Sequence, residues 1–137
     1  MNNNEPENLT QKEAATAYAR AWNRLDCTDF LKLLAEDAHY SSQMVLNELK
    51  NKQEISEYLT GKMETIKGYG DYVKAELAVV QSPLSEQIGV YMTRGVIEGF
   101  KAEEAVVLFE VSEDKITRVN MCMPGLFGGR LTGEVPE

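Results

Sequence analysis

The sequence is poor in the residues on which many metal sites and nucleophilic enzymes depend. Its 137 residues include one histidine and two cysteines, and neither a Cys-x-x-Cys nor a His-Glu-x-x-His spacing occurs. A zinc site would need ligands scattered along the chain, so we expect no metal and no cofactor. Cys27 and Cys122 are interpreted as small apolar residues rather than a disulfide, because a chain of this length can fold without one.

Positive charge is also scarce. The chain carries 14 Lys and Arg residues against 22 Asp and Glu residues, a formal net charge of −8, and no basic cluster. A polyanion would be repelled by most of such a surface, so we expect neither nucleic acid nor an anionic membrane as a partner. No apolar run approaches the roughly 20 residues of a membrane-spanning helix. The first residues also lack the pattern of a signal peptide, which favours a soluble, cytoplasmic protein.

The composition that remains is typical of one globular domain. Hydrophobic residues make up 43% of the chain and charged residues 26%, enough for a single core at this length. We expect a disordered N-terminus over residues 1–8, a folded domain over residues 9–123 and a flexible C-terminal tail over residues 124–137.

Helical signals dominate the first half of the chain. Thr10-Gln-Lys-Glu13 has the form of a capping box, and an apolar face follows it at helical spacing. A short second helix is expected to bury Phe30, Leu31 and Leu34, and a strand is expected from Ala38 to Met44. A third helix should begin at Asn51 and end at Gly68. The apolar face of the first helix consists of Ala14, Tyr18, Ala21, Trp22 and Leu25, and that of the third of Ile55, Tyr58, Leu59, Met63 and Ile66.

Strand signals dominate the second half. Turn residues such as Ser82-Pro83 and Glu98-Gly99 separate four segments, and no gap is long enough for a helix. The strands should therefore pair as an antiparallel meander. The segment Pro124 to Arg130 is not expected to continue the sheet. The four predicted strands are Tyr72–Gln81, Gln87–Ile97, Glu103–Val111 and Lys115–Met123.

Three segments, in this order of elements, carry a resemblance to a known family. They are Tyr18-Ala-Arg-Ala-Trp-Asn-Arg-Leu-Asp26, Phe30-Leu-Lys-Leu-Leu-Ala-Glu-Asp37 and Asn51-Lys-Gln-Glu-Ile55. Over residues 9–123 the chain resembles the nuclear-transport-factor-2-like superfamily, which includes SnoaL-like and ketosteroid-isomerase-like proteins. The resemblance implies an α+β, cystatin-like fold, in which a cone-shaped curved antiparallel sheet wraps three N-terminal helices and leaves a pocket at one end.

The ketosteroid isomerase branch of that family offers a chemical test. Its mechanism needs a carboxylate base, with a tyrosine and a protonated aspartic acid as oxyanion donors. By the resemblance, Tyr18 stands at the tyrosine position, Ser42 at the base and Val107 near the second donor. A serine hydroxyl is too weak a base and valine donates no proton, so steroid isomerisation of this kind is excluded.

The same resemblance, with helical spacing and strand alternation, predicts one pocket. Its candidate lining is Tyr18, Trp22, Tyr40, Ser42, Tyr58, Val107 and Phe109. Each of these residues also has an ordinary interpretation as core or as a satisfied hydroxyl on a wall. The methionines Met92, Met121 and Met123 suit either a pocket lining or plain core.

The charged residues are weaker candidates for a functional role. His39 is the only side chain whose unperturbed pKa suits acid–base work near neutrality, and Asp37 could orient it. Alternation along the strand, however, places His39 on the face opposite Tyr40 and Ser42, which favours a structural or surface role. Glu48 and Lys62 are expected to be solvated surface residues.

The strand from Glu103 to Val111 is apolar on both faces at its centre. Ala105, Val107, Phe109 and Val111 share one face, while Val106 and Leu108 lie on the other. A sheet with one wet face should alternate apolar and polar residues. We therefore predict a homodimer through the outer sheet face, with Val106 and Leu108 near the contact. The alternative is two exposed aliphatic side chains on a monomer.

Two functions remain open from the sequence. The first is a pocket protein of SnoaL-like type that binds a small, largely apolar molecule, either as a simple binder or as an enzyme of the isomerase, dehydratase or cyclase type. The second is a non-catalytic dimeric binding or interaction module. Because fold does not imply function, the content of the pocket has to distinguish them.

Overall fold

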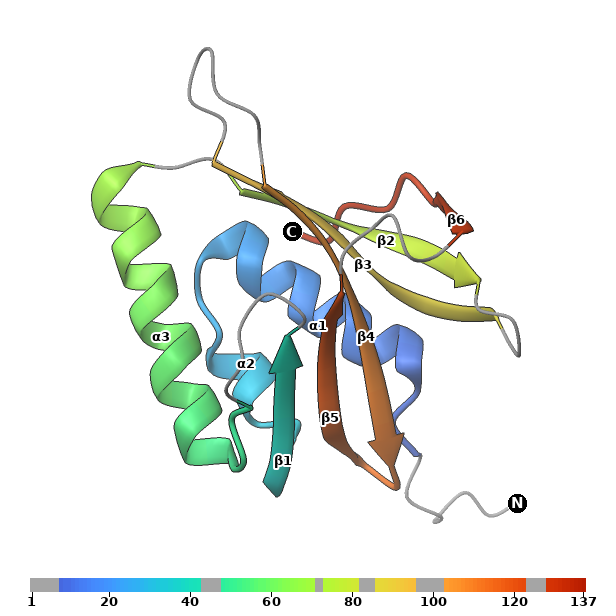
Figure 1. Ribbon diagram of the computed structural model, residues 1–137, viewed down its shortest axis with the longest axis horizontal. Helices are drawn as coiled ribbons and strands as arrows, with labels where there is room; N and C mark the ends of the chain where they lie inside the picture. Colours follow the sequence, from blue (N-terminus) through green and yellow to red (C-terminus); the bar gives the residue numbers. More distant parts are fainter. Residues whose placement is uncertain (1–7, 43–47, 71–72, 82–85, 96–102, 123–127) are drawn as a thin grey trace.

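The computed structural model describes residues 8–42, 48–70, 73–81, 86–95, 103–122 and 128–137. Within these ranges the chain forms three helices and one six-stranded, curved, unclosed sheet, an α+β arrangement (Figure 1). The elements are α1 (Gln11–Arg24), α2 (Thr28–Leu31), β1 (Leu34–Ser42), α3 (Lys52–Tyr69), β2 (Val73–Gln81), β3 (Glu86–Arg94), β4 (Glu103–Ser112), β5 (Lys115–Cys122) and β6 (Gly128–Leu131).

The strand order across the sheet is β1-β5-β4-β3-β2-β6. Strands β2 to β5 pair antiparallel with one another in chain order, which confirms the predicted meander. The first strand, β1, joins this meander at the β5 edge and runs parallel to β5. The helical half of the chain and the strand-rich half are thus joined through one continuous sheet.

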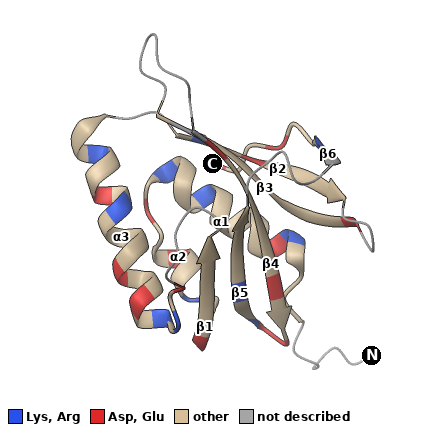
Figure 2. Cartoon of the chain, viewed as in Figure 1, with Lys and Arg blue, Asp and Glu red and all other residues tan. Residues whose placement is uncertain are grey.

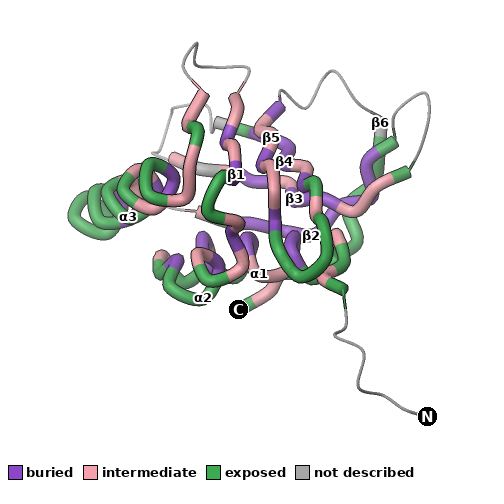
Figure 3. The backbone as a smooth tube through the Cα atoms, turned by 90° about the horizontal axis from the view of Figure 1, so that it is seen from below, coloured by how far each residue is buried: buried purple, intermediate pink, exposed green. Residues whose placement is uncertain are grey.

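Helix α1 begins at the predicted capping box. The Thr10 hydroxyl accepts a hydrogen bond from the Glu13 amide, and the Glu13 carboxylate accepts one from the Thr10 amide. The buried face of the helix is rich in alanine, with Tyr18 and Trp22 as its large side chains. Small residues let a helix lie close to its neighbours, and α1 packs across β2, β3 and β4 (Figures 1 and 3).

The segment after α1 differs from the prediction. The second helix is shorter than expected and ends at Leu31, and Leu34 belongs to β1. Leu34 is buried and pairs with Ile116 of β5, so the strand starts four residues before the predicted Ala38. A neighbouring strand, which the local sequence cannot reveal, decides this boundary. The predicted strand end at Met44 lies outside the described residues.

Helix α3 follows its sequence signals closely. The Asn51 side chain accepts a hydrogen bond from the Glu54 amide at the start of the helix. The helix continues through Gly61 and Gly68 and stops at Gly70, whose φ of 67° is left-handed. The expected end at Gly68 was therefore too early. The helix stands beside β1 at the edge of the sheet (Figure 1).

The C-terminal segment is the main correction to the predicted fold. Residues 128–131 form β6, which pairs antiparallel with β2, so the expectation that this segment cannot continue the sheet is wrong for β6. Residues 132–137 also make hydrogen bonds to β2 and α1. A short strand rich in glycine carries little sequence signal, because the exposed edge of β2 supplies most of its pairing.

Both cysteines are buried free thiols, which confirms their interpretation as apolar residues. Among the described residues, no helix is long and apolar enough to cross a membrane.

Candidate functional site

Most of the predicted pocket residues lie together on the inner face of the sheet. Tyr18, Trp22, Tyr40, Val107 and Phe109 are all buried members of one hydrophobic cluster, and Tyr58 packs against it from α3. Ser42, at the end of β1, is half-buried. Helix α1 supplies the first two side chains, β1 the third and β4 the next two, so the site draws on elements far apart in sequence.

Alternation along β1 divides its side chains between two environments. Tyr40 pairs with Val119 of β5 and is buried in the cluster. His39, one residue earlier, pairs with Arg118 and lies on the other face. The irregularity in the β1–β5 ladder falls between Leu34 and His39, ahead of these residues, so the regular alternation from His39 onward is kept.

Two tyrosine hydroxyls meet inside the cluster. The hydroxyl oxygens of Tyr18 and Tyr40 are 3.3 Å apart. The Tyr40 hydroxyl also lies 4.0 Å from the sulfur of Met121, which is a weak acceptor. The indole Nε1 of Trp22 faces the Tyr18 hydroxyl and has no acceptor of ordinary geometry among the described residues. Hydrogen-bond donors therefore outnumber good acceptors here.

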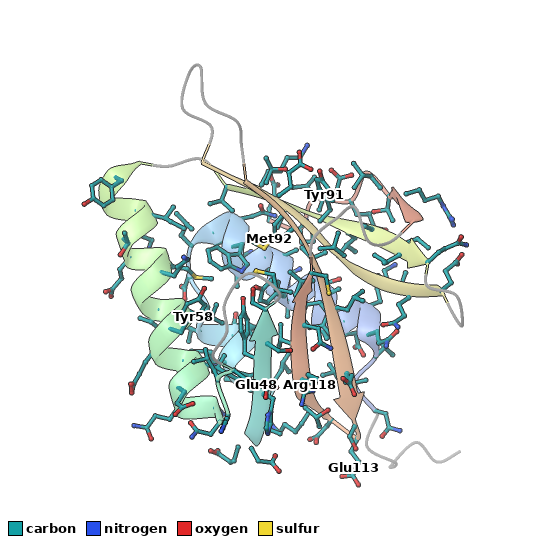
Figure 4. All side chains as sticks on the ribbon, in the orientation of Figure 1. Glu48, Tyr58, Tyr91, Met92, Glu113 and Arg118 are labelled. Atoms are coloured by element: carbon teal, nitrogen blue, oxygen red, sulfur yellow. The ribbon has the colours of Figure 1, made fainter. Side chains whose placement is uncertain are left out.

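Aromatic rings hold these hydroxyls in place. The Tyr18 ring makes edge-on contacts with Phe30 and Phe109, with ring centroids 5.1 Å and 5.3 Å apart. Such T-shaped pairs are favourable beyond the area that they bury. On the α3 side, the Tyr58 ring lies 5.5 Å from the Tyr40 ring, and the Lys62 ammonium lies 5.7 Å from the Tyr58 centroid (Figure 4).

Burial decides the chemistry of both hydroxyls. It raises the pKa of Tyr18 from 10.0 to about 12 and raises the pKa of Tyr40 well above 10.0. Removing a phenolate from water is costly, so the neutral form is favoured. At neutral pH both groups are therefore hydrogen-bond donors and acceptors and not bases.

The described part of the cluster holds no group suited to act as a general base. Glu76 is the only buried charged residue that is described. It alternates with Ala75 and Leu77, which face the cluster, so its carboxylate is on the opposite face of β2. No three His, Cys, Asp or Glu side chains of the described ranges come close enough to hold a metal ion.

A polar network that the sequence did not indicate covers the outer face of β1 and β5. Glu48 forms an ion pair with Arg118 and lies 3.3 Å from Nδ1 of His39. The hydrogen bond from Arg118 lowers the pKa of Glu48. The Glu48 side chain lies at the surface, as expected, with 32% of its area exposed, but it is held in an ion pair beside Arg118 (Figure 4). Arg118 comes from β5, and pairing across the sheet is what brings it to Glu48.

The outer network continues toward β4. The Ser41 hydroxyl donates to Asn120 Oδ1 at 2.6 Å, and Arg118 Nε lies 3.6 Å from Glu110 Oε2. His39 thus takes part in a structural network, as the alternation of β1 favoured.

Comparison with known proteins identifies the fold. Neither a model of a known protein family nor a curated protein sequence matches the chain. A cystatin-fold protein from Novosphingobium aromaticivorans is similar in structure, with a TM-score of 0.58, 18% identity and coverage of 82% of this chain and 97% of that one.

Two further solved structures have the same architecture. A candidate polyketide cyclase from Xanthomonas campestris pv. campestris has a TM-score of 0.53 at 18% identity, covering 85% of this chain and 91% of that one. A nuclear-transport-factor-2-like (NTF2-like) protein of unknown function from Cytophaga hutchinsonii has a TM-score of 0.54 at 15% identity, covering 85% and 92%. The chain therefore has the cystatin-like, nuclear-transport-factor-2-like fold, as the sequence resemblance implied.

Proposed function

We propose that the protein binds a small, largely apolar molecule that presents one hydrogen-bond acceptor, such as a carbonyl oxygen, to the Tyr18–Tyr40 hydroxyl pair. The observation that carries this proposal is the chain of donors inside the aromatic cluster. If Tyr18 donates to Tyr40, the only acceptor among the described residues for the Tyr40 proton is the Met121 sulfur, 4.0 Å away. A ligand oxygen would be a far better acceptor in the same place.

We expect a ligand to enter from the Tyr40 end of the cluster. Tyr18 and Tyr40 are buried, whereas Ser42, Tyr58 and Met121 around Tyr40 are half-buried. A molecule that displaces solvent there would contact aromatic and thioether side chains on one side and the hydroxyl pair at its tip. Pockets of this kind are mostly apolar, with a few polar groups that fix the orientation.

The same geometry allows both a binder and an enzyme. Two neutral hydroxyl donors in a dry site would stabilise negative charge that develops on a carbonyl oxygen, which suits isomerase, dehydratase or cyclase chemistry of the SnoaL-like kind. The candidate polyketide cyclase among proteins of similar structure fits a carbonyl-bearing ligand. Because no base stands in the described cluster, a binder without catalysis is the simpler form of this proposal.

The ligand proposal is tested with a matched pair of probes. We expect 4-tert-butylcyclohexanone to bind more tightly than tert-butylcyclohexane, as followed by the fluorescence of Trp22, the only tryptophan of the chain. Tyr40→Phe should weaken ketone binding about 2- to 12-fold, the range expected for one neutral hydrogen bond, and leave the hydrocarbon unchanged. Tyr69→Phe removes an exposed hydroxyl and serves as the control. Equal loss for both probes would contradict the proposed contact.

A second candidate function, the dimeric interaction module, is favoured by a separate apolar cluster on the outer sheet face. Ala78, Val80 and Val106 are buried there, and Tyr91 and Leu108 pack against them. Val106 is already 6% exposed within one chain, so a partner would contact Leu108 and Tyr91 more than Val106. We propose a homodimer through this face, with Leu108 near its centre.

A further inference from the structure

The C-terminal segment, residues 128–137, lies along the free edge of the sheet. Strand β6 pairs with the end of β2, from Ala78 to Gln81. Beyond β6, the Thr132 amide donates to the Leu77 carbonyl at 3.1 Å and the Leu77 amide donates to the Glu134 carbonyl at 2.9 Å. Main-chain hydrogen bonds of this kind are how an extended peptide adds a strand to an exposed sheet edge.

At Ala75, where the C-terminal segment no longer pairs with β2, the Asn23 side chain makes the hydrogen bonds of the β2 edge. The carboxamide oxygen of Asn23 accepts from the Ala75 amide at 2.8 Å, and its nitrogen donates to the Ala75 carbonyl at 2.9 Å. The same nitrogen donates to the carbonyl of Pro136 at 2.6 Å. Asn23 therefore acts as one residue of a neighbouring strand and also holds the incoming peptide backbone.

Positive charge gathers on the same side of α1, although the whole chain is strongly acidic. Arg20 Nε and Arg24 Nη2 both donate to the carbonyl of Glu137, at 3.2 Å and 2.7 Å. Lys12 lies 3.8 Å from the carboxylate of Glu134. Figure 2 shows several Lys and Arg positions, in blue, along α1. The face that holds the C-terminal segment is thus complementary to acidic peptide.

The apolar side chains of the C-terminal segment are only partly buried. Leu131 is 53% exposed and Val135 is 38% exposed. A hollow of about 580 Å³ remains between the segment, α1 and the start of β2, lined by Asn23, Arg24, Val73, Lys74, Val135 and Glu137. Backbone hydrogen bonds and charge hold the segment, and its apolar side chains contribute little.

We propose that Arg20, Asn23, Arg24, Ala75 and Leu77 form a binding site, here called the edge site, for an extended acidic peptide of a partner protein. The chain's own residues 132–137 occupy the edge site in cis and compete with that partner. A short tether gives the cis segment an effective concentration in the millimolar range, so a partner peptide binds only when the cis segment detaches.

Gly133 offers a way to detach the segment without altering the edge site. Its φ is +84°, and its amide donates to the Glu76 carboxylate at 3.0 Å. Proline holds φ near −65° and has no amide proton, so Gly133→Pro in the full chain should release residues 132–137. The probe is a fluorescein-labelled peptide of residues 132–137 with both ends blocked, and fluorescence anisotropy reports its binding.

We expect the probe to bind Gly133→Pro at least about tenfold more tightly than the wild-type chain, whose edge site is occupied. A probe that itself carries Gly133→Pro should bind neither protein. Adding Asn23→Leu to Gly133→Pro should abolish binding, and adding Arg20→Gln with Arg24→Gln should weaken it about tenfold and reduce its salt dependence. Trp22 fluorescence and circular dichroism check that each variant is folded.

Equal and weak binding of the probe to folded Gly133→Pro and wild type would overturn the proposal. A wild-type dimer that the free probe converts to monomer would also overturn it, because the occupant would then be a second copy of the chain. If Gly133→Pro does not fold, amide hydrogen exchange of the wild-type chain tests the proposal instead. The Leu77 and Thr132 amides should exchange several-fold faster at 0.5 M than at 0.05 M salt, and the exchange of the Val119 amide should not depend on salt. If the Leu77 and Thr132 rates do not change with salt, the proposal is overturned.

Discussion

Tyr18 and Tyr40 determine what the interior of the fold can do chemically. Their hydroxyls lie, with the indole N–H of Trp22, in a largely apolar cluster, and burial keeps both hydroxyls neutral well above physiological pH. A neutral phenol donates a hydrogen bond without becoming a base. This property favours recognition or polarisation of an oxygen atom over proton abstraction.

The raised pKa of Tyr18 predicts a loss of stability in strong alkali. The hydroxyl titrates near 10 in the unfolded chain and at about 12 in the folded one. Stability is therefore unaffected below pH 10 and falls as the pH rises from 10 to 12, because only the unfolded chain releases the proton. One such group contributes a slope of about 1.4 kcal/mol per pH unit, and Tyr40 acts in the same direction.

Urea unfolding at a series of pH values tests this expectation. Tyr18→Phe should be less stable than wild type below pH 9, since the Tyr40 hydroxyl loses its partner, and the difference should narrow between pH 10 and 11.5. Tyr69→Phe, at an exposed position, should keep a constant offset from wild type. Parallel curves for Tyr18→Phe and wild type would show that Tyr18 is not responsible.

For single residues, the sequence predicted which face of a strand or helix a side chain occupies, but not which distant residue it contacts. Alternation along β1 correctly separated His39 from Tyr40, because the side-chain period of a strand is a local property. It could not find Arg118 beside Glu48, since that contact depends on the parallel pairing of β1 with β5. The hydroxyl contact between Tyr18 and Tyr40 depends in the same way on packing between α1 and β1.

At the scale of elements, the helix starts were the most predictable features. The capping box at Thr10 and Glu13 and the cap at Asn51 are present as the sequence indicated. Each satisfies amide groups that have no partner within the helix, and each uses residues at most three positions apart. Such short-range signals do not depend on how the rest of the chain folds.

The cap of α1 gives a prediction about stability. Thr10→Ala removes the hydroxyl that accepts from the Glu13 amide and should lower the free energy of unfolding by about 1 kcal/mol. Thr16→Ala makes the same chemical change inside the helix, where the hydroxyl only bonds back to the Lys12 carbonyl. Alanine is the better helix former, so chemical denaturation should show Thr16→Ala to be neutral or slightly stabilising. An equal loss in both variants would argue against a capping role.

The strands at the two edges of the sheet were the least predictable elements. Strand β1 begins earlier than its local pattern suggested, and β6 was not predicted at all. Gly129 of β6 shows why: a Cβ built there would lie 2.5 Å from the Val79 carbonyl oxygen, so only glycine allows this close pairing. Glycine lowers strand propensity. The residue that this pairing requires therefore weakens the sequence signal of the strand.

For the whole molecule, the outer sheet face leads to the prediction of a homodimer. Stable interfaces bury about 1,200–2,000 Å² in total, which one sheet face from each copy can provide. Sedimentation should show a wild-type dimer at high micromolar concentration. Leu108→Glu should give a folded monomer under the same conditions, because it places an unpaired charge in the contact. Tyr69→Glu introduces the same charge at an exposed site on α3 and should leave the dimer intact.

A wild-type monomer at that concentration would contradict the dimer, and the outer cluster of Ala78, Val80 and Val106 would then be simply a second small core within one chain. An intact dimer of Leu108→Glu would place the contact elsewhere on the molecule.

The sequence by itself determined the order of the elements from α1 to β5, the helix caps, the antiparallel meander and the inner face that buries Tyr18, Trp22 and Phe109. These follow from periodicity and capping, which act over a few residues. Only the tertiary structure decided the parallel pairing of β1, the hydroxyl pair, the ion pair of Glu48 and the addition of β6. Each of these joins residues far apart in the chain, and its free energy arises only once the sheet has brought them together.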